Sequence, residues 1–153
     1  MEINFSLLKL RKANLSDALI VYKWAMDPTV RAYSINADYF SFSEHLQWFK
    51  KKINHPDTLY FILEHHFPLG QIRFDYSKEG WIISFLIDEN FRGLGLGFEI
   101  VKRGIEASKK NAYIAYVKEN NVTSNKIFEK LNFNIIPSDI VHTLKWEKRI
   151  IHS

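Results

Sequence analysis

Three of the six glycines in the chain lie within five residues, at Gly93, Gly95 and Gly97. Glycine permits backbone angles that other residues avoid, and it lets a ligand approach the main chain closely. The residues that follow are predicted to form a helix, whose first turn offers unpaired N–H groups and the positive end of the helix dipole. Such a turn can bind a phosphate or pyrophosphate, although it is also compatible with a loop that binds nothing.

Two common nucleotide-binding motifs do not fit this turn. The phosphate loop of nucleoside triphosphatases requires a lysine followed by serine or threonine after its last glycine, and neither is present. The dinucleotide fingerprint G-x-G-x-x-G requires glycine three residues after Gly95, where the chain has Phe98. The anion is therefore expected to belong to another kind of cofactor.

The hydrophobic pattern around the turn alternates between strand and helix periodicity. The predicted helices run from Ser16 to Met26, from a capping box at Ser41 to Ile53, from Gly95 to Lys110, and from Thr123 to Leu131. The predicted strands are Ile3 to Leu10, Thr58 to Glu64, Gln71 to Tyr76, Trp81 to Asp88, Ala112 to Val117, Asn134 to Ile136 and Val141 to Trp146. This order favours an α/β (α+β) fold, in which helices cover both faces of a mixed sheet.

Composition narrows the class of protein. The chain has 153 residues, which predicts one domain over 1–153, and 46% of them are hydrophobic, an ordinary value for a globular protein. The absence of cysteine excludes a disulfide scaffold, a thiolate metal site and a cysteine nucleophile. The net charge of +4 favours an anionic partner. No signal peptide or long apolar run is found, so we expect a cytoplasmic protein without a membrane partner.

Two segments together resemble the GNAT superfamily of acetyl-CoA-dependent N-acetyltransferases. The segment from Arg92 to Gly97 matches the family signature Q/R-x-x-G-x-G/A, and the segment from Asn121 to Phe133 is similar to the family block N-x-x-(A/S)-x-x-(L/I)-Y-x-K-x-G-F. The spacing and the order of strands also agree, so the resemblance covers nearly the whole chain. It implies a mostly antiparallel sheet of about seven strands with about four helices, splayed between the fourth and fifth strands.

The resemblance also implies which residues contact the cofactor, acetyl-CoA. The backbone of Phe85 to Ile87 would pair with the pantetheine arm as an added strand does, and the amides of Gly93 to Phe98 would hold the pyrophosphate. Asn121 would hydrogen-bond the coenzyme, and the helix that contains Phe128 would line the thioester. The full set is Phe85, Leu86, Ile87, Arg92, Gly93, Leu94, Gly95, Leu96, Gly97, Phe98, Asn121 and Phe128.

The chain departs from the family pattern at two positions. Asn132 replaces a glycine at a helix end, where asparagine also tolerates the left-handed conformation. Phe128 replaces the tyrosine that serves the family as general acid, and a phenyl ring has no proton to donate. The thiol of CoA has an ordinary pKa of ~8.5, so its thiolate is an adequate leaving group. Acetyl transfer therefore does not require a tyrosine general acid. Tyr116, Ser124 or water could supply the proton instead.

The front half of the chain is similar to the GNAT branch that acetylates the 4-amino group of UDP-linked deoxyamino sugars in pseudaminic or legionaminic acid assembly. The strings Glu44-His-Leu-Gln-Trp-Phe49 and Gly70-Gln-Ile-Arg-Phe-Asp75 carry this resemblance. A UDP-sugar has two phosphates, which suit arginine, and two rings, which suit aromatic surfaces. The residues expected to bind it are Arg31, Tyr33, Ser34, His45, Trp48 and Arg73.

The expected reaction is direct attack of an amine on the thioester, since the chain has no cysteine to form an acyl-enzyme. His45, directly or through water, would remove the proton of the amine. Each acceptor residue also has a structural alternative. His45 could be a partly buried structural histidine, Glu44 a capping-box carboxylate, Trp48 a core or rim aromatic, and Arg73 the partner of Asp75.

Other functions remain open at this point. The chain could be a protein N-terminal or small-amine acetyltransferase, or a CoA-binding regulatory module without catalysis, for which Phe128 is the best argument. No pair of histidines at helical spacing indicates a metal, and the run Lys50 to Lys52 is too short to indicate nucleic-acid binding. The expected partner is a small amine, and a homodimer is possible.

Overall fold

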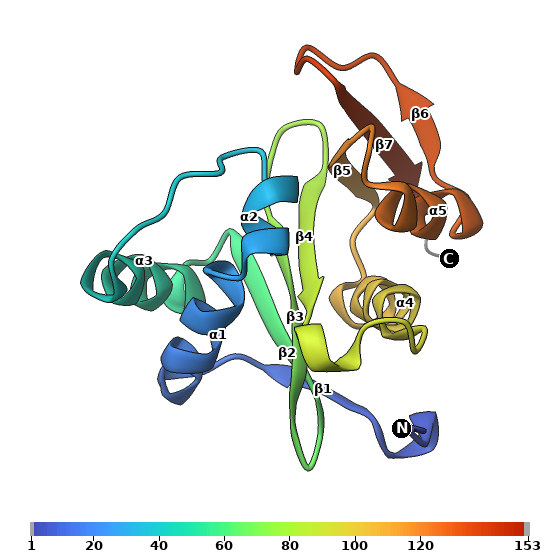
Figure 1. Cartoon of the computed structure of the whole chain (residues 1–153). Coiled ribbons are helices and arrows are strands. Elements are labelled where there is room, and N and C mark those ends of the chain that lie inside the picture. The colour runs from blue at the N-terminus through green and yellow to red at the C-terminus, as the bar shows by residue number, and fades with distance from the viewer. Residues whose placement is uncertain (1, 152–153) are drawn as a thin grey trace.

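The computed structural model describes residues 2–151 and contains one seven-stranded sheet with helices on both faces (Figure 1). The strands are β1 Lys9–Lys12, β2 Thr58–His65, β3 Phe67–Asp75, β4 Trp81–Ile87, β5 Ala112–Lys118, β6 Asn134–Ile136 and β7 Thr143–Arg149. The α-helices are α1 Ala18–Ala25, α2 Pro28–Tyr33, α3 Phe42–Asn54, α4 Leu96–Ser108 and α5 Val122–Lys130. Short 3₁₀ turns cover Phe5–Leu7, Leu15–Asp17 and Glu89–Phe91.

The sheet has the order β1-β2-β3-β4-β5-β7-β6, and every neighbouring pair except one is antiparallel. The exception is β4 with β5, which are parallel and pair only at Trp81 with Tyr113 and at Ile82 with Ile114. Beyond Ile82 the two strands diverge, while β4 stays paired with β3 as far as Ile87. The mixed, mostly antiparallel sheet of seven strands and its splay between the fourth and fifth strands are therefore confirmed.

Two hydrophobic cores lie on opposite faces of this sheet. Along β3, Ile72 and Phe74 face the core under α4, whereas the alternate residues Gln71 and Arg73 face the side of α1 and α3, because side chains of a strand alternate between faces. The second core is smaller and is built from α1, α3 and β2 around the fully buried Phe49. The result is a sheet whose centre carries polar side chains only on the α1–α3 face.

Two predictions about the N-terminal region are wrong. The residues from Ile3 to Leu10 do not form one strand: Asn4 caps a 3₁₀ turn at Phe5–Leu7, and the strand begins only at Lys9. The apolar pattern that indicated a strand has a different origin: the segment before Lys9 packs against the hydrophobic core without pairing as a strand. Arg103 of α4 donates hydrogen bonds to the carbonyls of Leu8 at 2.9 Å and Phe5 at 2.8 Å, and so holds this segment against the core.

The second error is a missed helix. The first helix was expected to end before Asp27 and Pro28, and α1 does end at Ala25, but no helix was predicted after it. Pro28 occupies the first turn of α2, where a proline needs no N–H partner. Asp27 is the N-cap of this helix and its carboxylate accepts a hydrogen bond from the Thr29 amide at 2.8 Å. The fold thus has five α-helices among the described residues, one more than expected.

Strand β3 begins earlier than predicted. It starts at Phe67 rather than Gln71, so the turn expected over residues 65–70 shrinks to a tight reversal at His66, whose φ is +66°. Gly70 lies inside the strand, and this position requires glycine because a Cβ there would be 2.5 Å from the carbonyl oxygen of Leu86 on β4. No helix among residues 2–151 is long and apolar enough to span a bilayer.

Candidate active site

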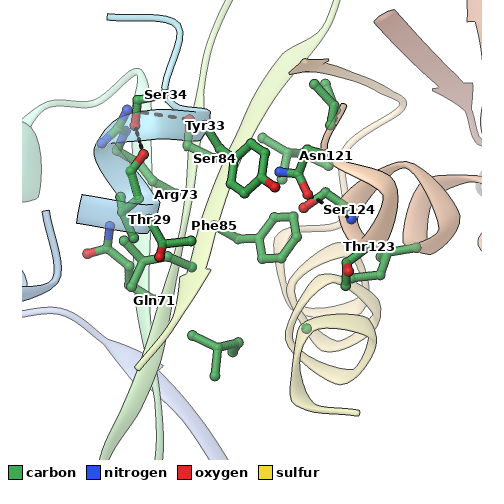
Figure 2. A pocket seen from close by; sticks show the side chains of 18 of the residues that line it. Thr29, Tyr33, Ser34, Gln71, Arg73, Ser84, Phe85, Asn121, Thr123 and Ser124 are labelled. Carbon is green, nitrogen blue, oxygen red and sulfur yellow. Dashed lines mark hydrogen bonds between the residues drawn. The ribbon is translucent and has the colours of Figure 1, made fainter. Parts of the chain in front are cut away.

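A cleft of about 1330 Å³ follows the splay of the sheet and joins its two faces. One wall is made by α1, α2 and α3, the floor by β3 and β4, and the other wall by the glycine turn, β5 and α5 (Figure 2). All of the predicted site residues except Leu94 line this cleft. The side chain of Leu94 packs against the core instead, so only its backbone is available to a ligand.

The edge of β4 forms the centre of the cleft. No described strand pairs with this edge past Ile82, so those peptide groups between Ser84 and Ile87 that do not pair with β3 face the gap toward β5. A ligand with alternating amide groups can hydrogen-bond such an edge as an added strand does. The Phe85 ring, labelled in Figure 2, lies at the middle of this edge.

The glycine turn lies at one end of the cleft and begins α4. Gly93 and Gly95 have φ values of +78° and +82°, which favour glycine, and Gly95 is the N-cap of α4 without any side-chain cap. Gly97 allows α5 to come close, because a Cβ there would be 2.9 Å from Cδ1 of Ile127. The first amides of α4 are thus presented to the cleft at the positive end of the helix.

Asn121 and Ser124 begin α5 on the far wall, where Figure 2 shows both side chains facing the cleft. Asn121 is the N-cap of this helix and accepts a hydrogen bond from the Ser124 amide at 3.3 Å. Tyr116 of β5 lines the same wall, with the Lys145 ammonium 5.4 Å from the centre of its ring. Both hydroxyls considered as proton donors are therefore in the cleft.

Phe128 is buried, at 1% exposure, in an aromatic group between β4 and the C-terminal strands. Its ring contacts Phe85 edge-on with centroids 6.0 Å apart, and it also packs against Phe133 and Trp146. Asn132, two residues after the end of α5, has a φ of +64°, so asparagine does adopt the left-handed conformation expected for this position. Phe128 gives the cleft an apolar surface beside the β4 edge.

Polar side chains lie together on the α1–α3 face of the sheet. The Tyr60 hydroxyl donates to Oε1 of Gln71 at 2.6 Å, which orients the Gln71 amide along the cleft. Arg73 donates to Asp75 at 2.7 Å and lies over the Trp48 ring, with 5.0 Å from its guanidinium carbon to the ring centroid. The alternative that Arg73 pairs with Asp75 is thus confirmed, and its guanidinium lines the cleft as well.

His45 is 2% exposed and is surrounded by the rings of Tyr22, Phe40, Trp48 and Phe49. Its Nε2 lies 3.1 Å from the Ala18 carbonyl, while its Nδ1 has no partner among the described residues. Burial lowers the pKa of His45 below its usual value, only partly offset by the hydrogen bond to Ala18. The buried alternative therefore describes its packing, and the role of base remains a prediction because the ring also lines the cleft.

Two other acceptor residues serve the local structure. The Ser41 hydroxyl accepts a hydrogen bond from the Glu44 amide at 3.1 Å and donates one to the Glu44 carboxylate at 3.1 Å, so the Glu44 carboxylate contacts the helix cap. Arg31 donates to the carbonyls of Asn36 at 3.1 Å and Asp38 at 3.0 Å and so holds the loop between α2 and α3. This use of Arg31 was not indicated by the sequence.

Several cleft residues were missed by sequence reasoning. Gln71 and Ser84 lie on the floor, Thr29 and Val30 on α2, and Thr123 and Lys126 on α5. Gln71 stands within the string that carried the family resemblance, two residues before Arg73, so strand periodicity alone would have placed both on one face. No group of three metal-ligating side chains occurs within residues 2–151.

A mixed sheet that splays beside a glycine turn, with that turn opening the next helix, defines a CoA-dependent acyltransferase fold. The chain belongs to the GNAT acetyltransferase family: the family described as "Acetyltransferase (GNAT) domain" matches residues 8–134. The protein is accordingly an enzyme, an acetyl-CoA-dependent N-acetyltransferase that acts on amines.

Similar proteins include one named relative and many solved structures. Acetyltransferase PseH of Campylobacter jejuni subsp. jejuni serotype O:23/36 (strain 81-176) is 26% identical over 130 residues, which is 82% of each chain. Spermidine N-acetyltransferase from Vibrio cholerae, solved in complex with CoA and spermine, is 16% identical, has a TM-score of 0.83 and covers 94% of this chain and 96% of its own. YncA from Salmonella typhimurium, a putative acetyltransferase solved with acetyl-CoA, is 14% identical, with a TM-score of 0.78 and 96% of each chain covered. These two structures show the shared fold.

Proposed function

We propose that the enzyme transfers the acetyl group of acetyl-CoA to the 4-amino group of a nucleotide-linked deoxyamino sugar. The observation that carries this proposal is the acceptor half of the cleft, where Arg73 is fixed between Asp75 and the Trp48 ring beside the oriented amide of Gln71. A fixed cation, an amide and an aromatic face suit the phosphate, hydroxyl and ring groups of such a sugar. The named relative PseH and the front-half strings support the same substrate class.

The cofactor half of the cleft fits acetyl-CoA on its own geometry. Gly93 and Gly95 leave the main chain bare at the start of α4, where the helix favours negative charge, and this suits a pyrophosphate. The open edge of β4 suits the amide-rich pantetheine arm. When bound, acetyl-CoA supplies the activated acetyl group as a thioester.

The chain's own groups then assist transfer in three ways. The amides on the open edge of β4 donate hydrogen bonds to the carbonyl oxygen that gains negative charge, an effect worth roughly 3–4 kcal/mol per donor in comparable sites. Phe85 and Phe128 exclude water from the reacting carbonyl. The proton leaves the amine for His45 directly or through water, and Tyr116, Ser124 or water protonates the departing thiolate.

The test is a thiol-release assay with acetyl-CoA and a panel of UDP-linked 4-amino sugars, N-terminal peptides and polyamines. We expect turnover with a 4-amino sugar at a kcat/KM at least 100-fold above that of the other amines. Preference for peptides or polyamines would assign the enzyme to the protein N-terminal or small-amine class. Binding of CoA without turnover of any amine would instead indicate a regulatory module.

A further inference from the structure

Helix α2 forms part of one wall of the cleft, and none of its residues belongs to either hydrophobic core. None of its residues is buried, yet Thr29, Val30, Arg31 and Tyr33 all line the cleft. In Figure 2 the Tyr33 ring extends from α2 toward the side of Asn121 and Ser124. A six-residue helix is too short to be stable alone, so contacts at its ends must set its position.

The first end of α2 is attached to the glycine turn. The Arg92 guanidinium donates to the Asp27 carboxylate at 2.9 Å and to the carbonyl of Ile87 at 3.2 Å. Burial alone would raise the pKa of Asp27, but hydrogen bonds from the Thr29 amide and from Arg92 lower it overall, so the carboxylate stays charged at neutral pH. This contact joins residues 65 positions apart across the mouth of the cleft.

The other end of α2 is attached to β5. The Lys118 ammonium donates to the carbonyl of Ala32 at 2.9 Å, across 86 positions of sequence. Lys118 is the last residue of β5, and its own carbonyl accepts a hydrogen bond from Asn125 of α5 at 3.1 Å. Both attachments of α2 therefore come from the wall of the cleft that is formed by the glycine turn and β5.

We propose that Lys118 is a positioning residue for the acceptor: it fixes the C-terminal end of α2 so that Tyr33 faces the open edge of β4. The inference rests on the proposed transfer reaction and adds to it a residue that contacts neither substrate. It assigns the geometry of the acceptor site to the end of β5, whereas the glycine turn and the β4 edge receive the cofactor without help from Lys118.

Substitution of Lys118 should change the KM for the acceptor without changing the KM for acetyl-CoA. For Lys118→Met we expect the KM for a UDP-linked 4-amino sugar to rise about tenfold, which corresponds to ~1.4 kcal/mol. The KM for acetyl-CoA and the calorimetric affinity for CoA should stay unchanged. Lys118→Arg should restore most of the acceptor KM, because a guanidinium can still reach the Ala32 carbonyl. Lys51→Met, an exposed lysine of α3 outside the cleft, is the matched control.

Hydrogen exchange measures the same attachment without an acceptor. Amides of residues 29–34 should exchange faster in Lys118→Met than in the wild type, while those of β2 and β3 should not change. An equal rise in KM for both substrates would overturn the positioning role. So would an unchanged acceptor KM together with unchanged hydrogen exchange. If the wild type binds CoA but acetylates no amino sugar, the proposed function fails, and the hydrogen exchange of residues 29–34 alone decides whether Lys118 holds α2.

Discussion

The guanidinium carbon of Arg73 lies over the Trp48 ring, 5.0 Å from its centroid, while Nε of the same guanidinium donates to Asp75 at 2.7 Å. Lys52 donates to the other oxygen of the same carboxylate at 2.8 Å. Arg73 is thus fixed on one side by charge and on the other by an aromatic face, which leaves a preformed cation in the acceptor half of the cleft.

Removal of this cation should weaken acceptor binding. For Arg73→Gln we expect the acceptor KM to rise at least tenfold, because a charge-assisted hydrogen bond contributes ~1.5–3 kcal/mol. Steady-state kinetics with both substrates varied will measure it, and the KM for acetyl-CoA should not move. Arg149→Gln, an arginine outside the cleft, provides the control. An unchanged acceptor KM would show that Arg73 is only the structural partner of Asp75.

Gly95→Glu should abolish the binding of acetyl-CoA. The substitution places a side chain at φ +82° and a negative charge at the start of α4, where the cofactor's pyrophosphate is proposed to lie. Gly95→Asn is the informative comparison, since asparagine tolerates this conformation and adds no charge. Isothermal calorimetry with CoA will measure both variants, and thermal melts will check their folding. Normal affinity in Gly95→Glu would contradict the pyrophosphate site.

The proton donor can be identified by substitutions that remove or restore side-chain hydroxyl groups. If Tyr116 is the general acid, Tyr116→Phe should lower kcat by about 100-fold, and Ser124→Ala should leave it unchanged. Phe128→Tyr should then restore part of the rate in the Tyr116→Phe background, because it returns a hydroxyl to the position that other family members use. Pre-steady-state thiol release separates this step from product release. Full activity of all single variants would assign the role to water.

Protonation of His45 should couple stability and activity to pH. Its pKa in the folded protein is below the ordinary 6.5, so the unfolded chain binds the proton more readily. Stability is therefore complete above pH 6.5 and should fall as the pH drops through the folded pKa. Melting temperatures of the wild type should fall more steeply between pH 7 and pH 5 than those of His45→Gln, which can still donate to the Ala18 carbonyl.

The same variant tests the role of His45 as base. A base at this position would place an acidic limb, with an apparent pKa below 6.5, in the pH profile of kcat/KM, and His45→Gln should lose that limb along with most of the rate. An unchanged profile in a folded variant would show that His45 acts only in packing. The melting curves and the rate profile together separate the two roles.

Local chemistry explains what could be predicted from the sequence. The cap at Ser41, the glycine turn and the alternation of Gln71, Ile72 and Arg73 depend on residues close together in the chain, so each was recognisable. The failures depend on distant partners. The N-terminal segment is held by Arg103, almost a hundred residues away, and α2 is held by Arg92 and Lys118.

The candidate site divides in the same way. The cofactor half follows from a turn and a helix start that are contiguous in sequence, whereas the acceptor half is assembled from α2, α3, β2, β3 and β4. Nothing in the string around Arg31 indicates that its guanidinium is occupied by the carbonyls of Asn36 and Asp38. Residue types therefore predicted which side chains meet in the cleft better than what each side chain does there.

Only two residue pairs join β4 to β5, so the sheet consists of two halves, β1 to β4 and β5 to β7, that are connected at one short paired region. Gly80 lies directly before this paired region, and a Cβ there would be only 3.0 Å from the carbonyl carbon and oxygen of Ala112. A side chain at position 80 would push against Ala112 where β4 and β5 are paired. It would thereby change the distance between the two strands where they diverge. We therefore expect the separation of β4 and β5 in the cleft to depend on the residue at position 80, which does not itself line the cleft.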